Sequence, residues 1–167
     1  MRKYCMSKDE LEDALGKVVY APHSDLHRGN LHLSEDCFTT PDRYCNVVIL
    51  PTARIDCTAN VTIGPWCMIG WDTKILTHDH YHIGRDKPLL LLQEERGVFW
   101  SDLVIGSDVW LHGCTILSQV TYIPDGVVVG ANAVLTKNPG PYEIWAGNPA
   151  RKVGERKPEL EGTFNDL

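Results

Sequence analysis

Residues 103–117, LVIGSDVWLHGCTIL, and residues 123–138, IPDGVVVGANAVLTKN, decide the fold of this chain. Within them, small or aliphatic residues recur at every sixth position, in two parallel series. The first series steps from Ile105 through Leu111, Leu117, Ile123, Val129 and Leu135. The second comprises Val109, Thr115, Thr121, Val127 and Ala133. A period of six fits neither an α-helix nor a simple alternating strand, so it predicts a chain that turns once per repeat.

The same two series occur earlier in the chain, in the same phase. The first runs from Leu33 through Thr39, Cys45, Pro51, Cys57, Ile63, Ile69 and Ile75. The second comprises Cys37, Arg43, Ile49, Ile55, Val61, Cys67 and Thr73. Because Pro51 falls on an inward position, we expect a distorted coil there. An antiparallel meander of equal strands is the alternative, but its hairpins need turn dipeptides that this chain mostly lacks.

Composition bounds the class of protein. A length of 167 residues suffices for one domain with a substantial core. The net charge of −6 gives no general attraction to nucleic acid or to a membrane surface. The first 17 residues, MRKYCMSKDELEDALGK, lack the apolar run of a signal peptide, and PLLLLQ at 88–93 is too short to span a bilayer.

The 6 cysteines show neither CxxC spacing nor the density of a disulfide scaffold. Cys45 and Cys57 fall on the first inward series, and Cys37 and Cys67 fall on the second. Each is therefore expected to be a small buried hydrophobe. Reduced thiols and the lack of a leader favour a cytoplasmic location.

Residues 60–70, NVTIGPWCMIG, and the two stretches quoted first resemble the hexapeptide repeats of the left-handed parallel β-helix acetyltransferases, which include sugar and xenobiotic acetyltransferases. The ending PGPYEIWAGNPARKV, at 139–153, is similar to the tail of that family and is the most specific likeness. The resemblance covers about residues 31–157. It implies an all-β fold, a triangular prism with an aliphatic interior. It also implies acetyl-CoA as cosubstrate and a homotrimer with active sites between adjacent prisms.

The chain divides into three parts on this interpretation. Residues 21–157 are expected to form the left-handed β-helix, interrupted by one long inserted loop at 77–103. Residues 1–20 are expected to form an N-terminal helical cap over the end of the coil stack. Its helix spans residues 7–16, SKDELEDALG, which begin with a capping box and end at a glycine. Residues 158–167 are expected to be an acidic C-terminal tail.

The inserted loop carries the histidine cluster THDHYH at 77–82. The resemblance aligns His80 with the histidine that similar acetyltransferases use as a base. Acetyl transfer to a hydroxyl or amine requires a proton to leave the nucleophile, and an imidazole is suited to that task near neutral pH. Asp79 is the candidate for binding the acceptor, whereas His78 and His82 are expected to be structural.

The loop also contains an apolar cluster, residues 89–92 with Phe99 and Trp100. A thin monomer has no place to bury these side chains. The cluster therefore suggests a subunit interface, in agreement with the homotrimer that the resemblance implies.

The candidate contacts to acetyl-CoA come from the resemblance and lie on the later coils. They are Trp110 as a wall of the pantetheine tunnel, the small corner residues Gly113, Ala131 and Asn132, the turn residues Thr136 and Lys137, and Arg151 for the nucleotide phosphates. A basic cluster of Lys137, Arg151, Lys152, Arg156 and Lys157 would supply local positive charge. His112 departs from the family, in which glycine is usual at that position. Thr40 stands where galactoside and maltose acetyltransferases carry a sugar-binding asparagine, which argues against those two substrates.

Three functional hypotheses remain open at this point. The first is an acetyl-CoA-dependent O- or N-acetyltransferase without a metal, acting on a small-molecule sugar acceptor, with a xenobiotic hydroxyl as the alternative acceptor. The second is a zinc enzyme similar to the γ-type carbonic anhydrases, because His27 and His32 have the spacing of a ligand pair in that group. The third is a catalytically silent repeat protein that serves as a scaffold. Neither nucleic acid nor a membrane is an expected partner.

Overall fold

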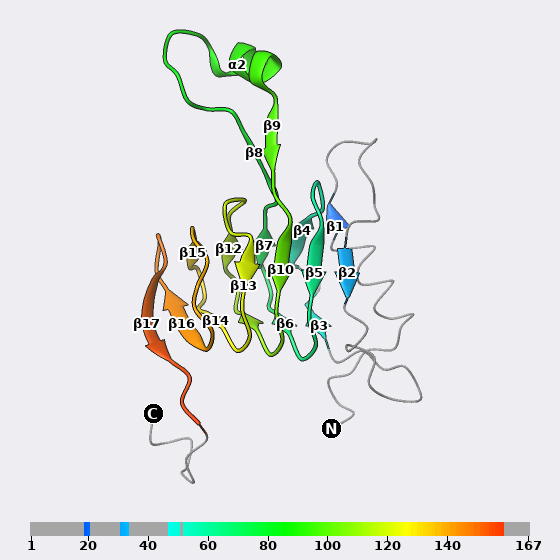
Figure 1. The fold of residues 1–167 in the computed structure, drawn as a ribbon, viewed down its shortest axis with the longest axis vertical. Helices are drawn as coiled ribbons and strands as arrows, with labels where there is room; N and C mark the ends of the chain where they lie inside the picture. The colour runs from blue at the N-terminus through cyan, green and yellow to red at the C-terminus, as the bar shows by residue number, and fades with distance from the viewer. Residues whose placement is uncertain (1–18, 21–30, 34–46, 51, 159–167) are drawn as a thin grey trace.

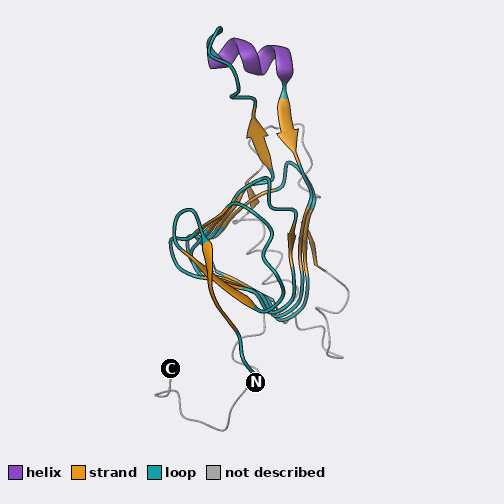
Figure 2. Ribbon diagram, turned by 60° about the vertical axis from the view of Figure 1, so that its left-hand side comes forward, coloured by secondary structure: helices purple, strands orange, loops and turns teal. Residues whose placement is uncertain are grey.

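The computed structural model describes residues 19–20, 31–33, 47–50 and 52–158. In this part of the chain, parallel strands form a stack of coils with flat faces, from which one hairpin projects (Figures 1 and 2). Residues 1–18 of the predicted helical cap and the tail beyond residue 158 lie outside the described residues, as do Pro51, Thr40 and His27. The last two residues of the predicted cap, Val19–Tyr20, instead form a strand of the coil stack. No helix in the described part is long and apolar enough to cross a membrane.

Each face of the stack is one sheet, and the chain visits the faces in turn. The first face has the order β1 (Val19–Tyr20), β4 (Arg54–Asp56), β7 (Lys74–Ile75), β12 (Thr115–Ile116), β15 (Val134–Leu135). The second has the order β13 (Tyr122–Ile123), β10 (Leu103–Ile105), β5 (Val61–Ile63), β2 (Leu31–Leu33). The third has the order β17 (Arg151–Glu155), β16 (Glu143–Ala146), β14 (Val128–Val129), β11 (Trp110–Leu111), β6 (Met68–Ile69), β3 (Val48–Ile49). All pairs in these sheets are parallel except β16 with β17.

The strand register confirms the six-residue period. Leu111 pairs with Val129 on the third face, and Ile105 pairs with Ile123 on the second. Both pairs are separated by 18 residues, which is three repeats and one complete coil. The chain therefore returns to the same face after three repeats, as a parallel β-helix requires. Its left-handed turn stays a prediction.

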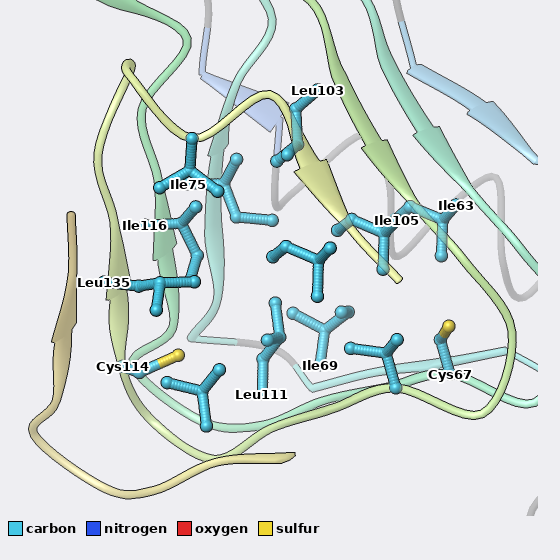
Figure 3. Packing of buried hydrophobic residues seen from close by; sticks show 14 of the residues in the cluster. Ile63, Cys67, Ile69, Ile75, Leu103, Ile105, Leu111, Cys114, Ile116 and Leu135 are labelled. Carbon is cyan, nitrogen blue, oxygen red and sulfur yellow. The ribbon is translucent and has the colours of Figure 1, made fainter. Parts of the chain in front are cut away.

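The inward side chains form one aliphatic core that runs along the stack (Figure 3). Ile63, Ile69 and Ile105 are fully or almost fully buried, as the two series predicted. The prediction is wrong for Thr115, Leu117 and Thr121, which are only half-buried or exposed. In each case the residue one position earlier is buried instead: Cys114, Ile116 and Val120.

A tight corner explains this slip. After Ile69 the next inward residue is Thr73, four positions on, but after Leu111 it is Cys114, three positions on. Gly113 lies in this shorter corner with φ of +59°, a conformation that glycine adopts without strain. A Cβ at Gly113 would also lie 2.8 Å from the carbonyl oxygen of Trp71 in the preceding coil.

The glycine after an inward isoleucine lets neighbouring coils stack closely. A Cβ on Gly64 would lie 2.6 Å from the carbonyl oxygen of Gly106 in the next coil. Gly64 N donates to the carbonyl oxygen of Ile105 at 2.8 Å, so the ladder of backbone hydrogen bonds continues through this corner. The sequence pattern IG therefore marks a corner at which backbone meets backbone.

The cysteines of the described coils belong to the core, as predicted for Cys57 and Cys67. Both are buried thiols outside any disulfide, and so is Cys114. Burial raises the pKa of Cys57 to about 11 and the pKa of Cys114 to about 12. These two thiols are therefore protonated and unreactive at neutral pH. Cys5, Cys37 and Cys45 lie outside the described residues.

The insertion has more regular structure than the predicted loop. Strands β8 (His78–His80) and β9 (Val98–Trp100) pair in antiparallel fashion, and α2 (Leu89–Arg96) lies at the far end of the hairpin (Figure 1). Strands of three residues carry too little alternation to be recognised from sequence. Leu89, Leu90 and Leu91 are exposed on this helix, whereas Leu92 is buried.

An acidic side chain holds the last strands together. Glu143 Oε2 accepts hydrogen bonds from Gly140 N at 2.7 Å and Trp145 Nε1 at 2.8 Å, and Glu143 Oε1 lies 3.0 Å from Lys152 Nζ. The Gly140 N–H, with the Lys152 and Trp145 donors, lowers the pKa of Glu143 from 4.5 to about 2. The carboxylate thus links β16 to β17 across the end of the stack.

We expect this link to give a pH-dependent contribution to stability. Because the folded-state pKa of Glu143 is lowered, the contribution is complete above about pH 4.5 and is lost as the pH falls towards 2. Urea unfolding of wild type and Glu143→Gln should show a difference in the free energy of unfolding at pH 6 that shrinks towards pH 2.5. A difference independent of pH would contradict this role. Glu95→Gln is the matched control on the exposed hairpin helix.

Candidate active site

The histidine cluster lies where the hairpin leaves the stack. Strand β7 ends at Ile75, Thr77 is buried, and β8 begins at His78. The antiparallel register places His78 opposite Trp100 and His80 opposite Val98. Side chains alternate along a strand, so His78 and His80 share one face of the hairpin and Asp79 lies on the other.

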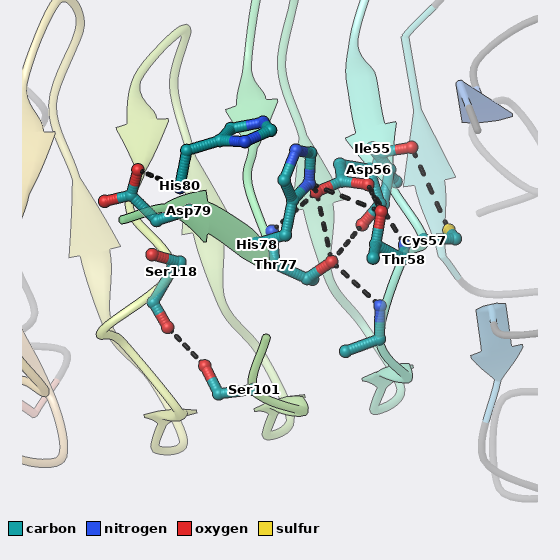
Figure 4. A network of polar contacts seen from close by, with 11 residues as sticks. Ile55, Asp56, Cys57, Thr58, Thr77, His78, Asp79, His80, Ser101 and Ser118 are labelled. Carbon is teal, nitrogen blue, oxygen red and sulfur yellow. Dashed lines mark hydrogen bonds and ion pairs between the residues drawn. The ribbon is translucent and has the colours of Figure 1, made fainter. Parts of the chain in front are cut away.

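Asp56, at the end of β4, is the partner of His78 (Figure 4). Asp56 Oδ2 lies 2.5 Å from His78 Nδ1. The carboxylate also accepts hydrogen bonds from Thr58 N at 3.0 Å, Thr58 Oγ1 at 2.7 Å and Thr77 N at 3.0 Å. Burial raises the pKa of Asp56, but these hydrogen bonds and that of His78 together outweigh it and lower the pKa below its ordinary value. Asp56 is therefore a buried carboxylate that stays ionised at neutral pH.

His80 lies beside this pair, and among the described residues no hydrogen bond reaches either of its ring nitrogens. Its Nδ1 is shielded from solvent and has no partner among the residues that the structure describes. The rings of His78 and His80 meet edge to face, with centroids 5.4 Å apart and planes at 77°. The ring of His78 thus lies between the Asp56 carboxylate and the ring of His80 (Figure 4).

The other polar groups of the cluster contact the backbone. Asp79 Oδ1 accepts a hydrogen bond from His80 N at 2.7 Å, and the Asp79 side chain is exposed. His82 is exposed, and its Nδ1 lies 2.9 Å from the carbonyl oxygen of His80. Both residues therefore shape the segment around His80.

The candidate cofactor residues fall into two groups along different edges of the first face. Gly113, Ala131 and Asn132 lie at the corner where the chain passes from the third face to the first. Asn132 N donates to the carbonyl oxygen of Gly113 at 2.9 Å, so these corners stack directly. Trp110 lies on the third face beside this corner and stacks on His112, with ring centroids 4.8 Å apart. A single chain does not bring this group to the histidines.

Thr136 and Lys137 lie at the opposite edge, which they share with the histidines. The first face pairs Ile75 with Ile116 and Ile116 with Leu135. Lys137, two residues past Leu135, is therefore level with Thr77, two residues past Ile75. Two strand spacings separate them along the stack, which is about 10 Å. The start of β8 and the turn after β15 thus line one edge of the prism.

Arg151 lies nearer to the first group than to the second. It pairs with Ala146 on the third face, which is level with Gly130, and Ala150 N donates to the carbonyl oxygen of Val134 at 2.8 Å, at the start of β15. Lys137 lies over the Trp145 ring, 5.3 Å from its centroid.

Lys152 and Arg156 are engaged elsewhere. Lys152 pairs with Glu143 and Glu155, and Arg156 Nη1 lies 2.7 Å from Asp108 Oδ2. The prediction that both cations contribute free positive charge is therefore wrong, because carboxylates pair with both of them. Lys137, Arg151 and Lys157 are the exposed cations of the cluster without a carboxylate partner among the ion pairs of the described chain.

Sequence reasoning found the histidines but missed Asp56. The six-residue period could have pointed to Asp56. Ile55 and Ile75 occupy equivalent inward positions and pair in the structure, so Asp56 is level with Leu76, two residues from His78. Within the described ranges, no three histidine, cysteine, aspartate or glutamate side chains gather to hold a metal ion. His32 lies exposed on β2.

Comparison with known proteins gives this geometry a context. No protein-family model matches the chain. A chloramphenicol acetyltransferase from Klebsiella aerogenes is 29% identical over 152 residues, which cover 82% of this chain and 65% of that enzyme. A protein of Escherichia coli K12, named for O-acetyl transfer in lipopolysaccharide biosynthesis, is 31% identical over 111 residues, 65% of this chain and 57% of the relative.

The solved structures agree on the architecture. A hexapeptide-repeat acetyltransferase from Vibrio cholerae, crystallised with acetyl-CoA, superposes with a TM-score of 0.56 and 20% identity, covering 90% of this chain and 78% of that chain. By sequence the chain is similar to a chloramphenicol acetyltransferase, and its fold is that of a hexapeptide-repeat acetyltransferase. It spans just under two thirds of the length of the Klebsiella acetyltransferase.

Proposed function

We propose that the chain is an acetyl-CoA-dependent acetyltransferase in which His80 is the general base. The observation that carries the proposal is the edge of the prism that the start of β8 shares with Thr136 and Lys137. It offers an imidazole at one end and the exposed Lys137 at the other, while Arg151 lies on the last strand near the corner of Ala131 and Asn132. The acetyltransferase relatives support the reaction class.

In the proposed reaction, both substrates bind together and no covalent enzyme intermediate forms. The acceptor hydroxyl or amine attacks the thioester carbonyl carbon of acetyl-CoA while His80 takes its proton. The C–S bond then breaks, the proton passes from His80 to the departing sulfur, and the products are the acetylated acceptor and free CoA. Lys137 and Arg151 would bind the CoA phosphates by charge-assisted hydrogen bonds. Asp79, exposed beside His80, would contact the acceptor.

We further propose that a homotrimer completes the site. Trp110, Gly113, Ala131 and Asn132 lie along a different edge from His80, so one chain alone would leave the cofactor with a single wall. A ring of three prisms would place that edge of one subunit against the histidine edge of the next. The exposed fractions of Leu90 (68%), Phe99 (55%) and Trp100 (66%) on the hairpin favour such contact, because exposed apolar clusters mark interfaces.

Two classes of acceptor are supported, and we propose a hydroxyl group in both cases. The relative named for lipopolysaccharide O-acetyl transfer favours a sugar. The chloramphenicol acetyltransferase favours a small xenobiotic alcohol. The left-handed turn of the coil, the helical cap and the cytoplasmic location belong to the same proposal.

An acceptor screen tests the function. Release of free CoA from acetyl-CoA should be accelerated by either N-acetylglucosamine or chloramphenicol, and mass spectrometry should show one added acetyl group on the acceptor. Turnover of the sugar alone would support the sugar hypothesis, and turnover of chloramphenicol alone would support the xenobiotic one. Failure to release CoA with any sugar, nucleotide sugar or antibiotic alcohol would contradict the proposed function.

A further inference from the structure

The ring of His80 needs a contact that sets its direction. A histidine that acts as a base is normally oriented by a hydrogen bond to its second ring nitrogen. The described residues offer no such bond to the shielded Nδ1 of His80. The ring contact seen for His80 is the edge-to-face packing against His78.

His78, in contrast, is held firmly. Asp56 is ionised and can only accept hydrogen bonds, so the proton of the 2.5 Å contact belongs to His78 Nδ1. Asp56 itself is fixed by Thr58 and by the backbone N–H of Thr77, which directly precedes His78. The His78 side chain has an exposed fraction of 17% and the Asp56 side chain 7%. The pair is therefore a rigid, mostly buried wall next to His80.

We propose that His78 is a positioning residue for His80 and that Asp56 is the anchor of His78. This inference rests on the proposed function, in which His80 takes the proton of the acceptor. Edge-to-face packing fixes the tilt of the His80 ring, and the Asp56 hydrogen bond fixes the ring against which it packs. Small displacements of a catalytic group lower the rate strongly, because the reacting atoms must be aligned.

Kinetics of two His78 variants tests this role. His78→Ala should lower kcat by about 10–100-fold with little change in the KM for acetyl-CoA. His78→Asn retains a donor for Asp56 but lacks the ring, so it should keep the thermal stability of wild type and still lose kcat. A wild-type kcat for His78→Asn would overturn the proposal, since the ring would then be dispensable.

A double variant separates positioning from an independent catalytic role. If His78 acts through His80, then His78→Ala combined with His80→Ala should be no slower than His80→Ala alone. Independent, multiplicative losses would show that His78 acts directly on the reaction, and the proposal would be wrong.

Imidazole NMR gives a readout that does not depend on acetyl transfer. In protein labelled with ¹⁵N-histidine, His78 should carry its proton on Nδ1, and His78→Ala should shift or broaden the ring signals of His80. Arg85→Ala, an exposed residue of the same insertion, is the control and should leave those signals in place. Unchanged His80 signals in His78→Ala would overturn the inference. Lack of acetyl-CoA binding by wild type would instead contradict the proposed function, so the two failures are distinguishable.

Discussion

Replacement of His80 by alanine should lower kcat by about 10²–10⁴-fold, the usual contribution of a general base. The KM for acetyl-CoA should change little, because the proposed cofactor contacts, Lys137 and Arg151, lie on other parts of the coil stack than His80. Steady-state release of CoA, measured with the acceptor found in the screen, gives both constants. His80 contributes no hydrogen bond from its ring within the described part of the chain, so the loss of activity should come without loss of stability.

His82→Ala is the matched control for this prediction. His82 lies in the same segment but is exposed, and its ring contacts only a backbone carbonyl among the hydrogen bonds of the described residues. Its kcat should stay within about threefold of wild type. If His80→Ala retained most of its activity while His78→Ala lost it, the base would be His78, oriented by Asp56. That result would contradict the assignment of His80.

Replacement of Ile69 by alanine should reduce the free energy of unfolding by about 2–5 kcal/mol, the range for large-to-small changes in a rigid core. Ile69 is fully buried on β6 and lies between β3 and β11 (Figure 3). The neighbouring coils are held by backbone stacking, so they cannot easily collapse into the cavity. Urea unfolding followed by circular dichroism measures the change.

Met68→Ala is the control for this prediction. Met68 precedes Ile69 on the same strand, but its side chain points outward with an exposed fraction of 45%. The substitution should destabilise by less than about 1 kcal/mol, as is usual for surface positions. Equal losses for the two variants would contradict the inward and outward assignment, whereas a larger loss for Met68→Ala would indicate that the third face is buried between subunits.

Much of the fold could be predicted because one period determines which side chains face inward. Ile63, Ile69 and Ile105 were placed correctly by counting in steps of six. At Thr115, Leu117 and Thr121 the period failed because a corner changed length. The corner at Gly113 has one residue fewer than the corresponding corner after Ile69. A single glycine with positive φ is not enough to predict that difference from the sequence.

The hairpin was beyond the same reasoning for a different reason. The six-residue repeat predicts coils that stack on one another. It predicts nothing about the structure of an inserted segment, because the insertion does not follow the period. β8 and β9 form because they face each other across a helix, and the sequence of three-residue strands does not encode such pairing strongly. The apolar cluster of the insertion was recognised, but its position on an exposed helix and strand was not.

Only part of the candidate site could be predicted from the sequence, because contacts between coils join side chains that are far apart along the chain. His80 was named from the resemblance to the acetyltransferases, and its role as the base stays a prediction. Asp56, 22 residues before its partner His78, was not found, although the register of Ile55 with Ile75 would have placed it nearby. Asp108 neutralises Arg156 from 48 residues away, which a count of positive charges along the tail does not show.

The central claim is that the chain binds acetyl-CoA and that Arg151 contacts its phosphates. Isothermal titration of acetyl-CoA into the wild-type protein tests it most directly. We predict a Kd in the micromolar range, about −8 kcal/mol. Arg151→Ala should weaken binding at least about tenfold, and Arg85→Ala, an exposed arginine on the hairpin, should not. Micromolar binding that depends on Arg151 would support the account. Absence of binding by the wild-type protein would contradict it.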